Sequence, residues 1–269
     1  MSSIVLTQLN IYPIKSCKGI SIETGQLVER GLQYDRRWMV VDENNRFISK
    51  REQPRLSLVE VTVHSDHLTV TSPGMDELRI PFVPTNRNPL SVAIWNDTVS
   101  AVEVGSDATA WFTRCLGASA RLVFMPDTAN RLASRRGYSS QMHLGDGYPL
   151  LVISEGSLAD LNTRLDEPLP MNRFRPNLVV KGCAPHAEDA WAEIMIGNAR
   201  LHIAKPCERC AITTVNQSTA EKGKEPLRTL ATYRQRDGVI LFGQNLIHEG
   251  KGVLKVGNEV TVLKHLERA

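Results

Sequence analysis

Short runs rich in Val, Ile and Thr recur along the chain, and Gly, Pro, Asn and Asp separate them. In the first part of the chain these runs cover residues 4–13, 36–43, 56–63, 67–72, 90–95 and 98–104. Runs this short, bounded by turn-forming residues, are typical of strands rather than helices. Many short strands at this spacing indicate a barrel-like or sandwich-like domain.

A helix is predicted over residues 107–116, with Ser106 as its cap and Gly117 as its stop. We take it as the hinge between two domains. A strand is expected at 121–126, and residues 127–147 are polar and basic with little periodicity, which predicts a long functional loop. After this loop Ser154 caps a second helix, and residues 226–234 form a short helix opened by Pro226.

Strand-like runs also fill the second half, at 150–153, 177–182, 199–204, 211–216, 252–256 and 259–264. We therefore expect a β-rich α+β fold with two β-barrel-like domains, 1–105 and 106–269, and a few packed helices.

Composition narrows the class of protein. The chain has 269 residues, 42% of them hydrophobic, and a formal net charge of +3, which permits an anionic ligand but does not indicate nucleic acid. We predict no signal peptide, and no apolar run approaches the ~20 residues of a membrane helix. An odd number of cysteines, five, is typical of reduced thiols, so we expect a cytoplasmic protein.

The stretch KPCERCAITT, residues 205–214, contains a C-x-x-C pair, Cys207 and Cys210. A structural zinc site needs about four ligands, and no second pair or spaced histidines accompany this one. A thioredoxin-like site needs a helix after the reactive cysteine, whereas residues 211–216 look like a strand. A buried, inert thiol is the simplest interpretation of Cys207. Arg209 beside Cys210 favours a thiolate there, which is the form that binds metal.

Basic and amide side chains lie at the ends of several predicted strands. Lys15, Ser16 and Lys18 follow the first strand, Arg36 precedes another, and Arg175 and Asn177 precede a third. Arg and Lys pair with phosphate through charge-assisted hydrogen bonds. The residues alone thus lead to two hypotheses, a thiolate metal site and an anion site, and spacing does not show whether these meet.

Eight segments, in one order along the chain, resemble the MOSC family, and most closely its bacterial YcbX-type and mitochondrial amidoxime-reducing members. The segments are YPIKSCKG, GLQYDRRWMV, SEGSLADLNTRL, NRFRPNLVV, AEDAWAEIMIG, KPCERCAITTV, EPLRTLATYR and LFGQN. The resemblance covers nearly the whole chain and implies a MOSC N-terminal β-barrel domain followed by a MOSC domain.

The resemblance also implies a molybdenum cofactor, with molybdenum bound to molybdopterin and to one protein cysteine, which falls on Cys210. It implies cofactor contacts from Lys15, Ser16, Arg36, Gly147, Tyr148, Arg175, Asn177, Glu208, Arg209 and Asn245. Side chains at Gly147, Tyr148, Glu208 and Asn245 differ from those of the mitochondrial members. Asp146 is a candidate acid near the metal, and a plain turn aspartate is the alternative.

The activity that the resemblance implies is reduction of N-hydroxylated compounds to amidines or amines. The chain lacks the cysteine spacing of a plant-type [2Fe–2S] cluster, so we expect electrons from a separate ferredoxin, flavodoxin or flavin reductase. Two alternatives stay open at this point. One is a module that carries or sulfurates the molybdenum cofactor, and the other is a zinc or redox C-x-x-C protein.

Overall fold

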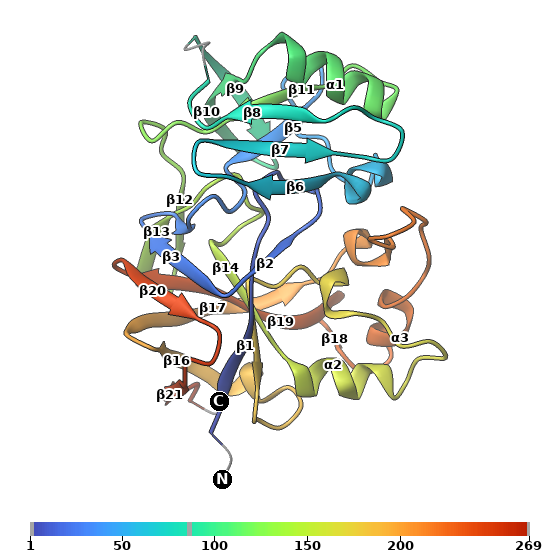
Figure 1. The fold of residues 1–269 in the computed structure, drawn as a ribbon. Coiled ribbons are helices and arrows are strands. Elements are labelled where there is room, and N and C mark those ends of the chain that lie inside the picture. Colours follow the sequence, from blue (N-terminus) through green and yellow to red (C-terminus); the bar gives the residue numbers. More distant parts are fainter. Residues whose placement is uncertain (1–2, 85–87, 268–269) are drawn as a thin grey trace.

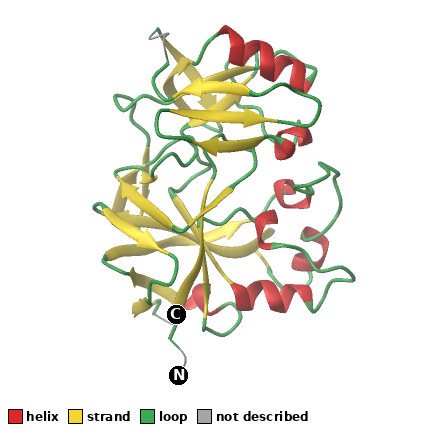
Figure 2. Cartoon of the chain, in the orientation of Figure 1, coloured by secondary structure: helices red, strands yellow, loops and turns green. Residues whose placement is uncertain are grey.

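The computed structural model describes residues 3–84 and 88–267, so the outermost residues of both expected domains lie outside the described part. It shows a β-rich molecule with two bodies, one above the other in Figure 1, and few helices (Figure 2). The predicted β-rich class is confirmed. Among the described residues, no helix has both the length and the apolar character needed to cross a membrane.

The lower body is built on one large sheet. Its strand order is β2 (Ile20–Ile22), β1 (Val5–Ile11), β15 (Leu178–Lys181), β14 (Leu150–Ser154), β19 (Val239–Glu249), β17 (Ala199–Glu208), β16 (Trp191–Ile196) and β21 (Val260–His265), and β18 (Gln235–Arg236) also pairs with β19. The regular pairing does not close into a barrel, although a single bridge from Val5 to Glu259 joins β1 to the residue before β21. A smaller sheet, β20 (Gly252–Lys255), β3 (Thr24–Val28) and β4 (Gly31–Leu32), completes this body.

Strand β14 shows why the central strands are apolar throughout. Successive side chains of a strand point to opposite faces of the sheet. Leu150 and Val152 enter the main core of the lower body, whereas Leu151 and Ile153 enter a second core beneath α2 (Glu155–Asn162) and α3 (Leu227–Ala231). Both faces of the sheet are covered at β14, so its residues do not alternate between apolar and polar.

The upper body contains two antiparallel sheets. One has the order β5 (Trp38–Val41), β11 (Arg121–Phe124), β10 (Asp97–Glu103) and β9 (Pro89–Ile94), and the other is β6 (Glu60–Val63), β7 (His67–Thr71) and β8 (Leu78–Pro81). Helix α1 (Ser106–Leu116) and the 3-10 turn η1 (Pro54–Leu58) pack on them. Their shared core includes Trp38, Trp111 and Phe112.

Strand pairing crosses the domain division that we predicted at residue 105. Strands β1 to β4 belong to the sheets of the lower body, although they come first in the chain. Helix α1 and strand β11, which follow residue 105, pack with the upper body. The division into 1–105 and 106–269 therefore stays a prediction, and the pairing partners of the first four strands could not be read from local sequence.

The helix signals are largely confirmed. The side chain of Ser154 accepts a hydrogen bond from the amide of Ser157 at the start of α2, as predicted for a cap. Gly117 ends α1 in a left-handed conformation. Ser106 is not the cap of α1, because it is the first helical residue and Gly105 precedes it. Two further 3-10 turns are η2 (Met171–Arg173) and η3 (Ala187–Ala190).

Three other predictions were wrong. Residues 211–216, expected as a strand, begin with a 3-10 turn, η4 (Ala211–Thr214). The supposed loop 127–147 contains a hairpin of β12 (Leu132–Arg135) and β13 (Tyr138–Gln141). The run 56–63 begins in η1 and becomes a strand only at Glu60. The hairpin is a local feature that we missed, since Arg136 and Gly137 between the paired Arg135 and Tyr138 both have positive φ. In the other two segments the local strand preference was too weak to decide the structure.

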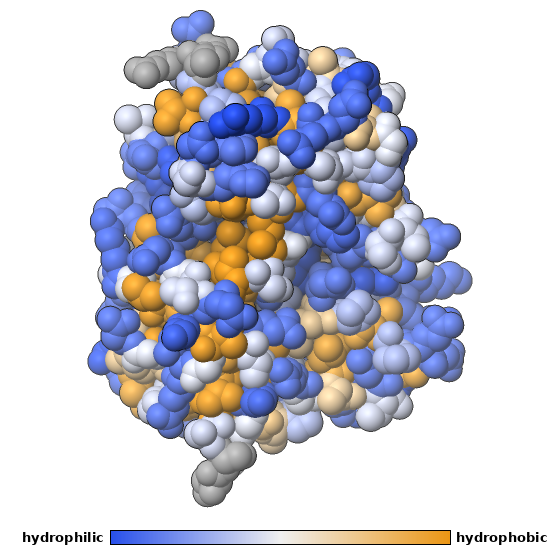
Figure 3. Space-filling model, viewed as in Figure 1, coloured by the Kyte–Doolittle hydropathy of each residue, from blue (hydrophilic) through white to orange (hydrophobic). Residues whose placement is uncertain are grey.

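Hydrophobic side chains form a strip down the middle of the face shown in Figure 3, where β2 and β1 lie. Hydrophilic side chains dominate the right of the same view, where the upper and lower bodies meet. The polar surface between the bodies is therefore the part of this face to search for a site.

Gly243 in β19 allows a close approach between two strands of the large sheet. Its φ is +79°, and an added Cβ would lie 2.6 Å from a side-chain carbon of Ile153 and 2.9 Å from the carbonyl oxygen of Val152. Gly238 has nearly the same φ, +80°, with nothing within 4 Å of an added Cβ. The two glycines therefore separate steric crowding from backbone strain.

We predict that Gly243→Ala lowers the free energy of unfolding by about 2–4 kcal/mol, because it adds a clash to an unfavourable φ. Gly238→Ala should cost about 1–2 kcal/mol, since only the backbone term applies. Urea unfolding of both variants measures the difference, and equal losses would contradict the steric explanation.

Candidate functional site

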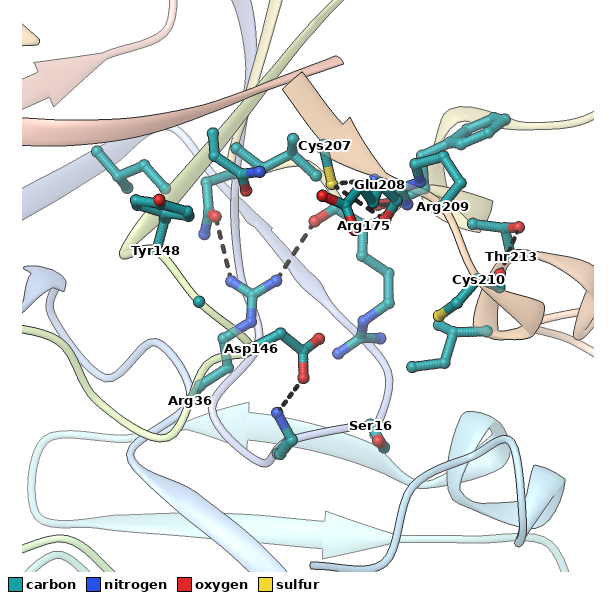
Figure 4. A pocket seen from close by; sticks show the side chains of 18 of the residues that line it. Ser16, Arg36, Asp146, Tyr148, Arg175, Cys207, Glu208, Arg209, Cys210 and Thr213 are labelled. Atoms are coloured by element: carbon teal, nitrogen blue, oxygen red, sulfur yellow. Dashed lines mark hydrogen bonds and ion pairs between the residues drawn. The ribbon is translucent and has the colours of Figure 1, made fainter. Parts of the chain in front are cut away.

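A cavity of about 670 Å³ lies where the two bodies meet, and its wall contains every metal and cofactor residue that the resemblance implied, whereas Lys18 lies outside it and pairs with Glu60. These residues come from positions far apart in the chain: Lys15, Ser16, Arg36, Asp146, Gly147, Tyr148, Arg175, Asn177, Glu208, Arg209, Cys210 and Asn245. Figure 4 shows those that it labels, among them Ser16, Arg36, Arg175 and Cys210, arranged around one space. The fold thus brings together the two hypotheses, the anion site and the thiolate site.

The ring of Tyr12, at the end of β1, positions two guanidinium groups. The guanidinium carbons of Arg36 and Arg175 lie 4.4 Å and 4.1 Å from its centroid. The phenol donates a hydrogen bond to the carbonyl of Pro176 at 2.9 Å, and burial raises the pKa of Tyr12 to about 12. Arginine over an aromatic face is a favourable contact that also fixes the plane of the guanidinium.

Three of the predicted residues adopt an unusual backbone conformation. Ser16, Arg36 and Arg175 have φ of 71°, 48° and 57°, in the left-handed region that favours glycine. Non-glycine residues there cost free energy and cluster at functional sites. Arg36 and Arg175 each point a long cation into the cavity wall from such a turn, and no sequence pattern revealed this.

At one end of the cavity Lys15 and Asp146 form an ion pair. The Lys15 ammonium is buried and donates to Oδ1 of Asp146 at 2.6 Å and to the carbonyl of Leu144 at 3.1 Å. Burial raises the pKa of Asp146, but the charge of Lys15 and the hydrogen bonds from Lys15 and Trp95 lower it by more. The pKa of Asp146 therefore lies well below that of an ordinary aspartate. Asp146 is therefore ionised at neutral pH and does not itself carry a proton to donate.

Arg131 holds the loop that presents Asp146. Its buried guanidinium donates to the carbonyls of His143 and Asp146 at 3.0 Å and 3.3 Å, and to the carbonyl of Gly145. It also pairs with Asp97 of the upper body at 2.9 Å. Sequence reasoning recognised this stretch as a functional loop but missed Arg131 as the residue that orders it.

The structure corrects the argument for a thiolate at Cys210. Arg209 donates to the sulfur of Cys207 at 2.9 Å and to the carbonyl of Phe174 at 2.7 Å. Residues two apart at the end of an extended strand share a face, so Arg209 faces Cys207 rather than its neighbour Cys210. Cys207 is thus not the inert buried thiol that we expected.

Cys210 comes directly before η4 and is exposed. Its carbonyl accepts hydrogen bonds from the amide and hydroxyl of Thr213 at 3.1 Å and 3.0 Å, which fixes the backbone of the turn. Figure 4 shows its sulfur directed into the cavity. An accessible sulfur held by a rigid turn is suited to bind a soft metal.

The remaining predicted residues are held by neighbours on other strands. The amide of Asn177 donates to Asn10 and accepts from Arg36, both at 3.1 Å. Glu208 accepts from Lys205 at 2.7 Å, and Asn245 donates to the carbonyl of Pro206 at 3.5 Å. A Cβ added at Gly147 would meet nothing within 4 Å, so no steric need for glycine is seen there.

Lys50 is the strongest sign that an anion belongs in the cavity. Its side chain forms part of the wall and is 0% exposed, yet its ammonium has no hydrogen-bond partner among the described residues. Burial, and then the charges of Arg175, Arg173 and Arg209, lower its pKa well below the ordinary value. A buried, unpaired ammonium is costly unless a ligand supplies its partner.

The charges of the wall lead to the same conclusion. Its six cations outnumber two carboxylates, Asp146 and Glu208, and each of these is already paired with a lysine. In the part of the chain that the structure describes, Arg175, Arg209 and Lys50 form no ion pair. The Nε of Arg209 is also buried without a partner there. The wall therefore fits a phosphate-bearing pterin cofactor whose metal takes one protein sulfur.

Several wall residues escaped sequence reasoning, among them Lys50, Trp95, Asn96, Phe174, Lys205 and Thr213. Lys50 lies in an ordinary polar segment before η1, and Trp95 in a hairpin turn, so neither carries a local signal. Only the meeting of the two bodies places them in one wall.

Comparison with known proteins gives a consistent result along the chain. Residues 3–119 match the MOSC N-terminal beta barrel domain, and residues 139–261 match the MOSC domain. The chain is 36% identical to mitochondrial amidoxime-reducing component 1 of Mus musculus, over 96% of this chain and 82% of the relative. It is 37% identical to component 2 of Bos taurus, over 95% and 82%, and 34% identical to component 1 of Homo sapiens, over 96% and 82%.

Two buried lysines in one wall allow a matched test of the anion site. We predict that Lys50→Met raises the free energy of unfolding of the cofactor-free protein by about 1–3 kcal/mol, because it removes an unpaired buried charge. Lys15→Met should instead lower it by at most about 1 kcal/mol, since it removes the partner of Asp146, whose side chain is 61% exposed. Urea unfolding at neutral pH measures both.

The stability gained by Lys50→Met should depend on pH, and the direction of that dependence follows from the pKa of Lys50. Lys50 has a lowered pKa in the folded state, so between that pKa and lysine's ordinary value the unfolded state binds more protons. The advantage of Lys50→Met should therefore be greatest at low pH and vanish as the pH approaches about 10.4. A loss of stability in Lys50→Met would show that the lysine is structural.

Proposed function

The chain belongs to the MOSC family and is a relative of the mitochondrial amidoxime-reducing components, and from this premise we propose that it is a molybdenum-dependent reductase of N-hydroxylated compounds. The family that we expected from the sequence is confirmed. The substrates proposed are amidoximes, hydroxylamines and N-hydroxylated bases, reduced to amidines or amines with release of water.

One observation carries the proposal: an accessible cysteine sulfur faces a cavity whose wall has three cations that lack carboxylate partners among the described residues. Cys210 supplies the sulfur, and Lys50, Arg175 and Arg209 supply the charges. A dianionic phosphate would satisfy such a wall, and Arg binds phosphate oxygens in a fixed geometry. No group of three or more His, Cys, Asp or Glu side chains among the described residues converges to hold a metal, which favours a metal held through one sulfur over a zinc cluster.

We assign Cys210 as the molybdenum ligand. The pterin and its phosphate would be bound by Lys15, Ser16, Arg36, Arg175, Asn177 and Arg209. The wall is completed by Gly147, Tyr148, Glu208 and Asn245. When bound, the cofactor supplies a metal that accepts the N-bound oxygen and exchanges two electrons. The guanidinium groups of Arg36 and Arg175, held against Tyr12, would bind the cofactor and so help to orient it.

The protein must also supply protons, because reduction of an N–OH group consumes two electrons and two protons and releases water. Lys15 holds a proton 2.6 Å from Oδ1 of Asp146 at the same end of the cavity. Burial lowers the pKa of Lys15 although Asp146 raises it, which makes this ammonium a better acid than an exposed lysine. We therefore assign proton delivery to Lys15, with Asp146 as the hydrogen-bond acceptor that holds its ammonium in place.

Electrons are proposed to come from a separate ferredoxin, flavodoxin or flavin reductase. The net charge of +3 suits an acidic donor. The cytoplasmic location expected from cysteine usage stays a prediction, and the relatives are mitochondrial proteins by name.

The test is metal and pterin analysis together with an activity assay. Protein from a molybdenum-replete host is expected to contain molybdenum and pterin and to reduce benzamidoxime with a chemical donor. Cys210→Ser should lose the metal or fall at least about 100-fold in activity, as removal of a ligand does. Cys207→Ser should keep substantial activity, because a serine hydroxyl can still accept the hydrogen bond from Arg209.

Other results of the metal analysis and the activity assay would each lead to a different conclusion. Equal loss in both cysteine variants would indicate a paired metal site, and zinc without pterin would reject the assignment. Molybdenum-loaded protein that reduces no N-hydroxylated compound would instead indicate a carrier or sulfur-transfer module.

A further inference from the structure

Trp95 occupies an unusual place at the cavity. It is the first residue of the turn between β9 and β10, with Ile94 and Asp97 paired on either side. Its φ is 55°, a conformation that favours glycine and is rare for a bulky side chain. Its side chain is 49% exposed, so burial does not explain a tryptophan there.

Three contacts hold the indole against the cavity wall. The guanidinium carbon of Arg51 lies 4.5 Å from its ring centroid, and the ring of Phe47 lies at 5.1 Å with a tilt of 56°. The indole N–H donates to Oδ1 of Asp146 at 3.1 Å. Trp95 is therefore an oriented aromatic surface that belongs to the upper body and contacts the acidic loop of the site.

Asp146 extends this surface with a hydrogen-bond acceptor. Both Lys15 and Trp95 donate to Oδ1. Among the described residues nothing donates to Oδ2, and Figure 4 shows the Asp146 carboxylate directed into the cavity. The wall thus offers an aromatic face and a free carboxylate oxygen side by side.

We propose that Trp95 is a substrate-positioning residue that selects planar, conjugated N-hydroxylated compounds, with the conjugated ring against the indole and an N–H or N–OH group donating to Asp146. The proposal rests on the reductase function above and narrows its substrate class. An aromatic amidoxime or N-hydroxylated base presents both features, whereas a small aliphatic hydroxylamine presents only the donor. Stacking of aromatic rings accounts for discrimination of about 3- to 10-fold.

Trp95→Gly is the informative variant, because glycine suits the left-handed turn and the hairpin should still fold. Trp95→Phe keeps an aromatic ring. Tyr138→Leu is the control, since Tyr138 is also an exposed aromatic residue but stacks on His202, outside the cavity wall. Thermal melts of all three check folding.

With molybdenum-loaded enzyme, Trp95→Gly should raise the KM for benzamidoxime about 3- to 10-fold with kcat changed less than about 2-fold. The KM for N-methylhydroxylamine should change less than about 2-fold, and Trp95→Phe should restore most of the preference. Equal changes for both substrates in Trp95→Gly would overturn the proposal, as would the same effect in Tyr138→Leu.

Calorimetric binding of the two compounds to the oxidised, loaded protein separates this proposal from the proposed function. Loss of the preference for benzamidoxime in Trp95→Gly supports the role of Trp95 even in a protein that turns over neither compound. Unchanged relative affinities reject that role even in an active reductase.

Discussion

The contact of Tyr12 with Arg36 and Arg175 organises the site. Both guanidinium carbons lie within 4.4 Å of one ring centroid, so two like charges pack against the same aromatic ring. A carboxylate in that place would neutralise them and remove their attraction for an anion. The aromatic face orients both cations and leaves Arg175 without a carboxylate partner among the described residues, whereas Arg36 also pairs with Asp35.

The rest of the cavity wall also has few carboxylates beside its cations. Asp35 pairs with Arg36 from behind, outside the wall, while Arg175, Arg209 and Lys50 have no acidic partner among the described residues. Unpaired cations cost folding free energy, and an anion bound in the cavity would offset that cost by supplying the missing counter-charge. Strained turns at Ser16, Arg36 and Arg175 add to the imbalance. Both the unpaired cations and the strained turns lower the free energy of unfolding, and both lie around the proposed anion site.

The candidate site depends on how the first strands pair. Strands β1 to β4 join the lower sheets, and the chain then enters the upper body at β5. Lys15 and Ser16 lie between β1 and β2, where the amide of Lys15 donates to the carbonyl of Trp38 in β5, and Arg36 lies just before β5. Residues 146–148 and 205–210 reach the same place from the lower body. The cavity exists only because the two bodies share segments at their junction.

The sequence by itself determined the strand-rich class, the caps at Ser154 and Gly117, and the identity of the polar motifs. These follow from short runs of β-branched residues and from turn chemistry, which act between near neighbours. The tertiary structure decided that Arg209 faces Cys207, that residues 211–214 form a turn and that Lys50 and Trp95 enter the wall. Those outcomes depend on contacts between residues far apart in the chain, whose free energy no local pattern encodes.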